Sequence, residues 1–158
     1  MRARLTIVAV IAIGALSTLA YLRSPGVPRT AWNALNDADR YELLSLNPHL
    51  SKPDYYGHEI LGQTLVQAPS VRERLNNTLK AGARSSDGRA YACFNPRHGI
   101  RVTHADVVTD LLICFECRQV QVWRGGQKIA YFLVSESPQP VFDEVLKSAG
   151  VPLAPKEP

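Results

Sequence analysis

Three cysteines are the residues in this sequence with the clearest capacity for chemistry. Cys93 lies in the segment AYACFNPRHGIRV, and Cys114 and Cys117 lie in DLLICFECRQVQVW. In an oxidising compartment one pair of three cysteines is expected to form a disulfide, which leaves a third thiol. The cysteines therefore predict a structural disulfide or a thiol-based site.

Cys114 and Cys117 lie three residues apart in a segment that is typical of a β-strand. Side chains at this spacing point to opposite faces of a regular strand, so the two share a disulfide or a metal only if the strand is broken between them. The apolar pattern changes phase between Phe115 and Val120, which predicts a bulge at residues 116–119.

The expected register of the neighbouring strands favours a different disulfide. A hairpin turn centred on residues 105–106 places Cys93 opposite Arg118, and therefore beside Cys117. We expect a disulfide between Cys93 and Cys117. A bond between Cys93 and Cys114 is the alternative, because the register is inferred from the position of the turn.

A zinc site is a second interpretation of the same residues. The thiolates of Cys93, Cys114 and Cys117 with the imidazole of His98 or His104 suit tetrahedral zinc. The sequence lacks a second closely spaced ligand pair, so we expect no cofactor, with zinc as the alternative. A redox role would place the first of two close cysteines at a helix N-terminus, whereas these surroundings indicate a strand.

Hydrolase chemistry is a third interpretation. His98 together with Glu116 or His104 is the candidate set for a general base and acid. No spacing in the sequence matches H-E-x-x-H, G-x-S-x-G or a P-loop. A hydrogen-bonded structural role is therefore favoured for each histidine.

The charge distribution argues against a nucleic-acid partner. The formal net charge is +4, but Arg2 and Arg4 lie in the N-terminal segment, and without them the chain is nearly neutral. Acidic residues are interspersed with basic ones, so no broad basic surface is expected. The expected partner is an unidentified protein or small molecule.

Residues 5–22 are uncharged and apolar and follow two arginines, which is the order of a secretory signal. As a helix they would reach about 27 Å, just short of the hydrocarbon core of a bilayer. Residues 1–23 therefore predict a signal anchor or a signal peptide. We expect a single membrane span through residues 5–22 with the domain outside the cytoplasm, or a periplasmic or secreted protein after cleavage.

The rest of the chain predicts one α+β domain over residues 40–153, between a linker at 24–39 and a tail at 154–158. The element order is β-β-α-β-β-β-α, with an antiparallel sheet of about five strands, one or two helices on one face, and a preceding hydrophobic helix. The first domain helix begins near Ser70 with the capping-box residue Glu73 and ends near Gly82. The expected extended runs are 41–46, 58–66, 90–103, 109–123 and 128–135, and the last helix spans about 138–149.

Four segments together resemble a family of small bacterial proteins that are exported or membrane-anchored. They are YYGHEILGQTLV, YACFNPRHGIRV, DLLICFECRQVQVW and SESPQPVFDEVLKSAGVP, and the pair CFxPRHGI and ICFxC is their most specific part. The resemblance implies one coherent domain and no particular activity. We therefore expect a non-enzymatic envelope module with a cysteine-stapled hairpin, with a thiol-based metal or redox site and a hydrolase as alternatives.

Overall fold

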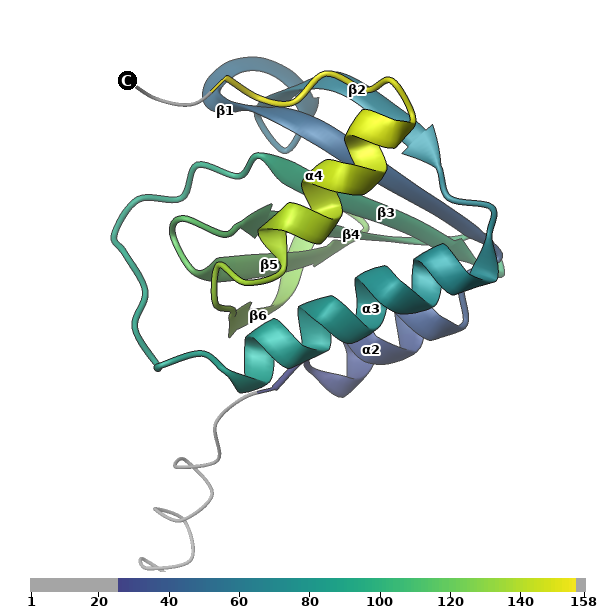
Figure 1. Cartoon of the computed structure of the whole chain (residues 1–158), viewed down its shortest axis with the longest axis horizontal. Coiled ribbons are helices and arrows are strands. Elements are labelled where there is room, and N and C mark those ends of the chain that lie inside the picture. The colour runs from purple at the N-terminus through teal and green to yellow at the C-terminus, as the bar shows by residue number, and fades with distance from the viewer. Residues whose placement is uncertain (1–25, 156–158) are drawn as a thin grey trace, which may run out of the picture.

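An antiparallel sheet forms the framework of the protein. The computed structural model describes residues 26–155, apart from the side chains of residues 50–53. The strands lie in the spatial order β2-β1-β3-β4-β5-β6 (Figure 1). The strands are β1 (Arg40–Tyr55), β2 (His58–Leu65), β3 (His98–His104), β4 (Val107–Cys114), β5 (Gln119–Arg124) and β6 (Gln127–Leu133), and the helices are α2 (Arg29–Asn36), α3 (Pro69–Arg84) and α4 (Gln139–Ser148).

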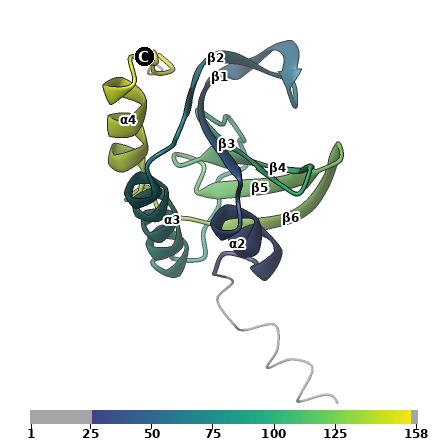
Figure 2. The same cartoon turned by 90° about the vertical axis from the view of Figure 1, so that its right-hand side faces the viewer.

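The sheet curls into a half barrel, and the long strand β1 accounts for much of the curvature (Figure 2). Its pairing with β2 shifts register after Ser45, after Leu46 and again after Leu50, and such bulges bend a strand. The tip of the β1–β2 hairpin contains Tyr56 and Gly57, both with positive φ. The first residue of β2, His58, is buried there, and its Nδ1 lies 3.2 Å from the carbonyl oxygen of Asn47.

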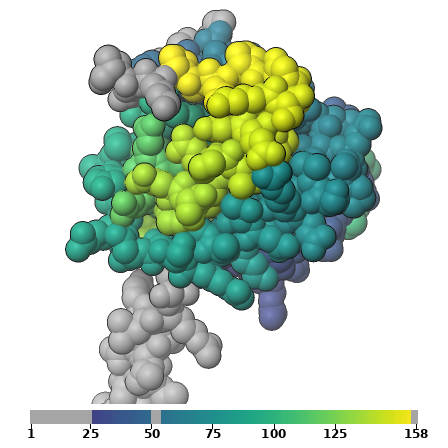
Figure 3. All heavy atoms as spheres, in the orientation of Figure 1, coloured from purple at the N-terminus to yellow at the C-terminus, as the bar shows by residue number. Residues whose placement is uncertain are grey.

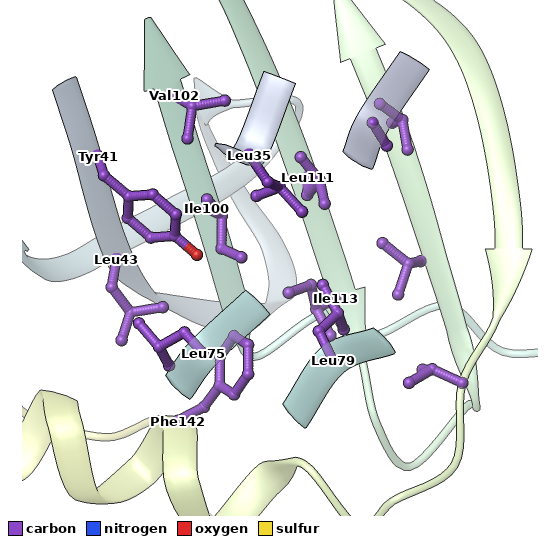
Figure 4. Packing of buried hydrophobic residues seen from close by; sticks show 14 of the residues in the cluster. Leu35, Tyr41, Leu43, Leu75, Leu79, Ile100, Val102, Leu111, Ile113 and Phe142 are labelled. Carbon is purple, nitrogen blue, oxygen red and sulfur yellow. The ribbon is translucent and has the colours of Figure 1, made fainter. Parts of the chain in front are cut away.

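One face of the sheet packs against all three helices and forms the main core. Alternate strand residues point to this face because side chains alternate along a strand. Figure 4 shows Tyr41, Leu43 and Ile100 from the sheet beside Leu75 of α3 and Phe142 of α4. In the space-filling view α4 lies beside α3 on the surface of the molecule (Figure 3). The residues after α4 pack on β2, where Val151 and Pro152 lie close to Gly62.

Helix α3 follows the predicted apolar spacing but not the predicted ends. Leu75 and Leu79 are fully buried, as their spacing indicates. No side chain caps the N-terminus, so the predicted capping box is wrong, and Pro69 occupies the first turn instead. The helix continues through Gly82, where an added Cβ would collide with the ring of Pro138. This glycine lets the segment before α4 pack closely on α3.

The predicted fold of about five strands with one or two helices is wrong in two respects. The run at residues 109–123 is two strands, β4 and β5, because the chain reverses between them. The expected linker at 24–39 contains α2, whose Ala31 and Leu35 lie in the core. The hydrophobic helix expected at residues 5–22 lies outside the described residues. Within residues 26–155 no helix has the length and apolar character needed to cross a membrane.

Candidate thiol site

The turn between β4 and β5 brings Cys114 and Cys117 together. β4 ends at Cys114, the chain reverses over residues 115–118, and the N–H of Arg118 donates to the carbonyl oxygen of Phe115 at 3.0 Å. Arg118 has a φ of 58°, which is the left-handed conformation that tight turns use. The change of apolar phase therefore marks a complete reversal of the chain, and the predicted bulge is wrong.

A disulfide joins Cys114 and Cys117 across this turn, with an S–S distance of 2.04 Å. The predicted bond from Cys93 to Cys117 is not the one that forms, nor is the alternative from Cys93 to Cys114. The spacing of Cys114 and Cys117 allows this bond only where the strand is broken between them, and the turn after β4 is that break.

Cys93 is a free thiol next to this disulfide. Its Sγ lies 3.6 Å from the Sγ of Cys117, so the predicted neighbour is correct although the predicted bond is absent. Cys93 is exposed, whereas Cys114 and Cys117 are each only 1% exposed. The cluster therefore pairs one accessible thiol with one buried disulfide.

Backbone and side-chain hydrogen bonds hold the Cys93 segment against the turn. This segment belongs to the long connection between α3 and β3, at the left of Figure 1. The N–H of Tyr91 donates to the carbonyl oxygen of Cys117 at 3.2 Å, and Gln119 Nε2 donates to the carbonyl oxygen of Tyr91 at 2.5 Å. The N–H of Asn95 points at the Sγ of Cys117 at 3.3 Å. Contacts on both sides of Cys93 therefore fix its position.

Arg118 adds a second set of contacts to the same segment. Its Nη1 lies 2.8 Å from Oδ2 of Asp87, and its Nε lies 3.3 Å from Oε1 of Glu136. The guanidinium carbon lies 5.6 Å from the centre of the Tyr91 ring. These contacts join Arg118, the residue after Cys117, to the segment that carries Cys93. They also raise the pKa of its guanidinium, chiefly through the hydrogen bond to Glu136.

A charged pair lies beside Cys114. Arg97 Nε lies 3.4 Å from Oε1 of Glu116, which is the residue of the turn just before Cys117. The Arg97 side chain is 8% exposed, and its Nη1 also donates to the carbonyl oxygen of Pro155. A small void, too narrow to hold a water molecule, is lined by Asn95, Arg97, His98, Cys114, Glu116 and Gln139, together with Phe115.

The structure brings together only part of the predicted hydrolase set, because His98 and Glu116 line the same void whereas His104 lies apart from them. His98 Nε2 lies 2.8 Å from Oδ1 of Asp143 in α4, and its ring packs on Phe115 and Phe142. His104 lies at the other end of β3, where its Nδ1 is 3.2 Å from Oδ2 of Asp39. Glu116 pairs with Arg97. Each candidate therefore has a separate charged partner.

The predicted zinc ligands are close together only in part. Cys114 and Cys117 are bonded to each other, and a disulfide sulfur is not the thiolate that zinc requires. Among residues 26–155 no group of three or more histidine, cysteine or acidic side chains is arranged to hold a metal ion.

Two residues of the site were not indicated by the sequence: Arg118 and Asp143. Arg118 follows Cys117 directly, and a positive charge next to a cysteine pair is a signal that could indicate its role. Asp143 is 45 residues from His98, and local spacing gives no sign of that contact.

The site consists of three sulfur atoms on two neighbouring segments. Thiol–disulfide exchange begins when a thiolate attacks one sulfur of a disulfide, and this arrangement places a thiol beside such a sulfur. Comparison of the chain with protein-family models, with curated proteins and with solved structures finds no match.

Proposed function

We propose that this protein is a thiol–disulfide exchange module in which Cys93 connects a buried disulfide to a dithiol partner. The observation that carries the proposal is the 3.6 Å separation between the Sγ atoms of Cys93 and Cys117. A free thiol held this close to a disulfide needs little movement to reach it.

The first step is internal and changes no oxidation state. The Cys93 thiolate attacks the Sγ of Cys117, a Cys93–Cys117 bond forms, and the Cys114–Cys117 bond breaks. Cys114 leaves as a thiolate and takes up a proton. The disulfide has then moved from a buried pair to one that includes an exposed cysteine.

The second stage transfers the disulfide to a partner that carries two thiols. A partner thiolate attacks the Sγ of Cys93, which forms a mixed disulfide and releases Cys117 as a thiolate. The partner's second thiol then attacks its own sulfur in that mixed disulfide and releases Cys93. The partner is oxidised to a disulfide, and Cys114 and Cys117 together receive two electrons. A partner disulfide reoxidises the protein by the reverse steps.

The magnitude of disulfide stabilisation favours exchange over a structural staple. Loop-closure entropy gives about 2 kcal/mol for a cross-link between residues three apart and about 3.5 kcal/mol for one that spans 24 residues. The observed bond therefore stabilises the fold less than the Cys93–Cys117 pairing would. A structural module with an unidentified partner is the second candidate, and the presence of the turn disulfide supports it.

The proposal includes the compartment expected from the sequence. An apolar segment after two arginines supports export or a membrane tether, which would place the domain outside the cytoplasm. Oxidising compartments are where protein disulfides persist.

The rate of reduction of the disulfide by dithiothreitol tests the proposal. We expect the Cys93→Ser variant to be reduced at least about tenfold more slowly than the wild type, because external thiols must then reach buried sulfurs directly. Ala92→Ser, an exposed change in the same loop, is the matched control and should react like the wild type. Equal rates of reduction for Cys93→Ser and the wild type would overturn the exchange proposal in favour of a purely structural disulfide.

A further inference from the structure

The exchange proposed above leaves Cys114 as a thiolate in a buried position. Cys114 is 1% exposed, and an uncompensated charge at such a site is strongly disfavoured. Its departure from the disulfide therefore depends on charged groups near its sulfur.

Arg97 is a positively charged residue level with Cys114 in the strand register. His98 pairs with Ile113 across the β3–β4 ladder, so the preceding residue, Arg97, comes level with Cys114. The N–H of Leu46 donates to the carbonyl oxygen of Arg97 at 2.9 Å, which holds this backbone in line with the sheet. Both Arg97 and Cys114 line the same small void. Because the guanidinium is nearly buried, solvent screens its charge only weakly.

Glu116 is the opposing charge. Its Oε1 lies 3.4 Å from Arg97 Nε, and it lines the same void as Cys114. The other titratable group of the void is His98, which Asp143 of α4 binds through Nε2. Glu116 is 52% exposed, so replacing it removes a charge with little loss of packing.

We propose that Arg97 and Glu116 regulate the exchange by setting how readily Cys114 leaves as a thiolate, with Arg97 favouring its departure and Glu116 opposing it. This inference rests on the proposed function. The effect of the two charges on the ionisation of the Cys114 thiol can be measured without any exchange.

The test measures alkylation of Cys114 against pH in the reduced full-length protein carrying Cys93→Ser, with peptide mapping to separate Cys114 from Cys117. We expect Glu116→Gln to move the midpoint of the Cys114 profile to lower pH by about half a unit, and Arg97→Gln to move it to higher pH by about half a unit to one unit. Arg97→Lys keeps the positive charge and should leave the midpoint closer to that of the parent protein. Glu144→Gln and Arg74→Gln, which break an exposed ion pair between α3 and α4, are matched controls.

Opposite shifts from the two charge changes support the inference, because general loosening of the fold would move both profiles in the same direction. A Glu116→Gln profile that matches Glu144→Gln overturns it, and this holds even if the Arg97 variants fail to fold. If Glu116→Gln shifts the Cys114 profile but Cys93→Ser does not slow reduction of the disulfide, the proposed exchange is overturned. The electrostatic role of Arg97 and Glu116 then still stands.

Discussion

The Sγ atom of Cys93 lies 3.6 Å from the Sγ atom of Cys117, which is itself bonded to Cys114. Cys117 therefore has two possible partners, one within the turn and one on the neighbouring segment. The two pairings differ in accessibility, because Cys93 is exposed and Cys114 is buried.

Replacing Cys114 should redirect the disulfide rather than remove it. In Cys114→Ser the only remaining thiols are Cys93 and Cys117, and their proximity predicts that oxidised glutathione joins them. The denatured protein should then be two protons lighter in mass and contain no alkylatable thiol. The new bond closes a longer loop, so the free energy of unfolding should match or exceed the wild-type value by about 1 kcal/mol. Two alkylatable thiols after oxidation would show that the segments do not meet in solution.

Arg118 should control the approach of Cys93 to the disulfide. Arg118→Gln removes the ion pairs to Asp87 and Glu136 and the contact with the Tyr91 ring. We expect reduction by dithiothreitol to slow several-fold and amide hydrogen exchange at residues 88–95 to quicken, because the segment loses an anchor. Arg118→Lys should restore part of the rate, and Arg74→Gln should change neither quantity. Unchanged exchange and reduction in Arg118→Gln would exclude the anchoring role.

His58 should make the stability of the β1–β2 hairpin sensitive to acid. Burial lowers the pKa of His58 below its ordinary value of 6.5, and the hydrogen bond to the Asn47 carbonyl offsets only part of this effect. The folded protein therefore binds fewer protons than the unfolded chain near this pH. The resulting stability is present above pH 6.5 and is lost as the pH falls below it.

Thermal unfolding of the wild type and of His58→Gln at pH 7.5 and pH 5 measures this effect. The wild type should lose more stability on acidification than the variant, which lacks the titrating group. His49→Gln, an exposed histidine on the same hairpin, should behave like the wild type. An equal loss in His58→Gln would assign the acid sensitivity to other groups.

Local patterns in the sequence predicted much of the fold. The spacing of Leu75 and Leu79 identified α3, and the turn at residues 105–106 fixed the register of β3 and β4, where His104 pairs with Val107. The reversal at residues 115–118 was missed because it lacks glycine, proline or asparagine, and Arg118 adopts the positive φ instead.

The site was predicted in part for a related reason. Extending the register of β3 and β4 backwards predicts that Cys93 lies near Cys117, although Cys93 lies in the connection before β3 and is held there by hydrogen bonds to the β4–β5 turn. Which two cysteines form the disulfide depends on whether the chain turns between Cys114 and Cys117. Contacts such as that of His98 with Asp143 depend on how α4 packs across the sheet. Such packing arises from the whole core rather than from local spacing.

Disulfide mapping of the purified full-length protein tests the exchange most directly. The oxidised protein is held at pH 8, quenched with acid, alkylated and digested, so that each cysteine is found either bonded or alkylated. Exchange predicts two populations, one with Cys114–Cys117 bonded and Cys93 alkylated, the other with Cys93–Cys117 bonded and Cys114 alkylated. A single Cys114–Cys117 population at every incubation time would contradict the exchange and leave the disulfide as a structural staple.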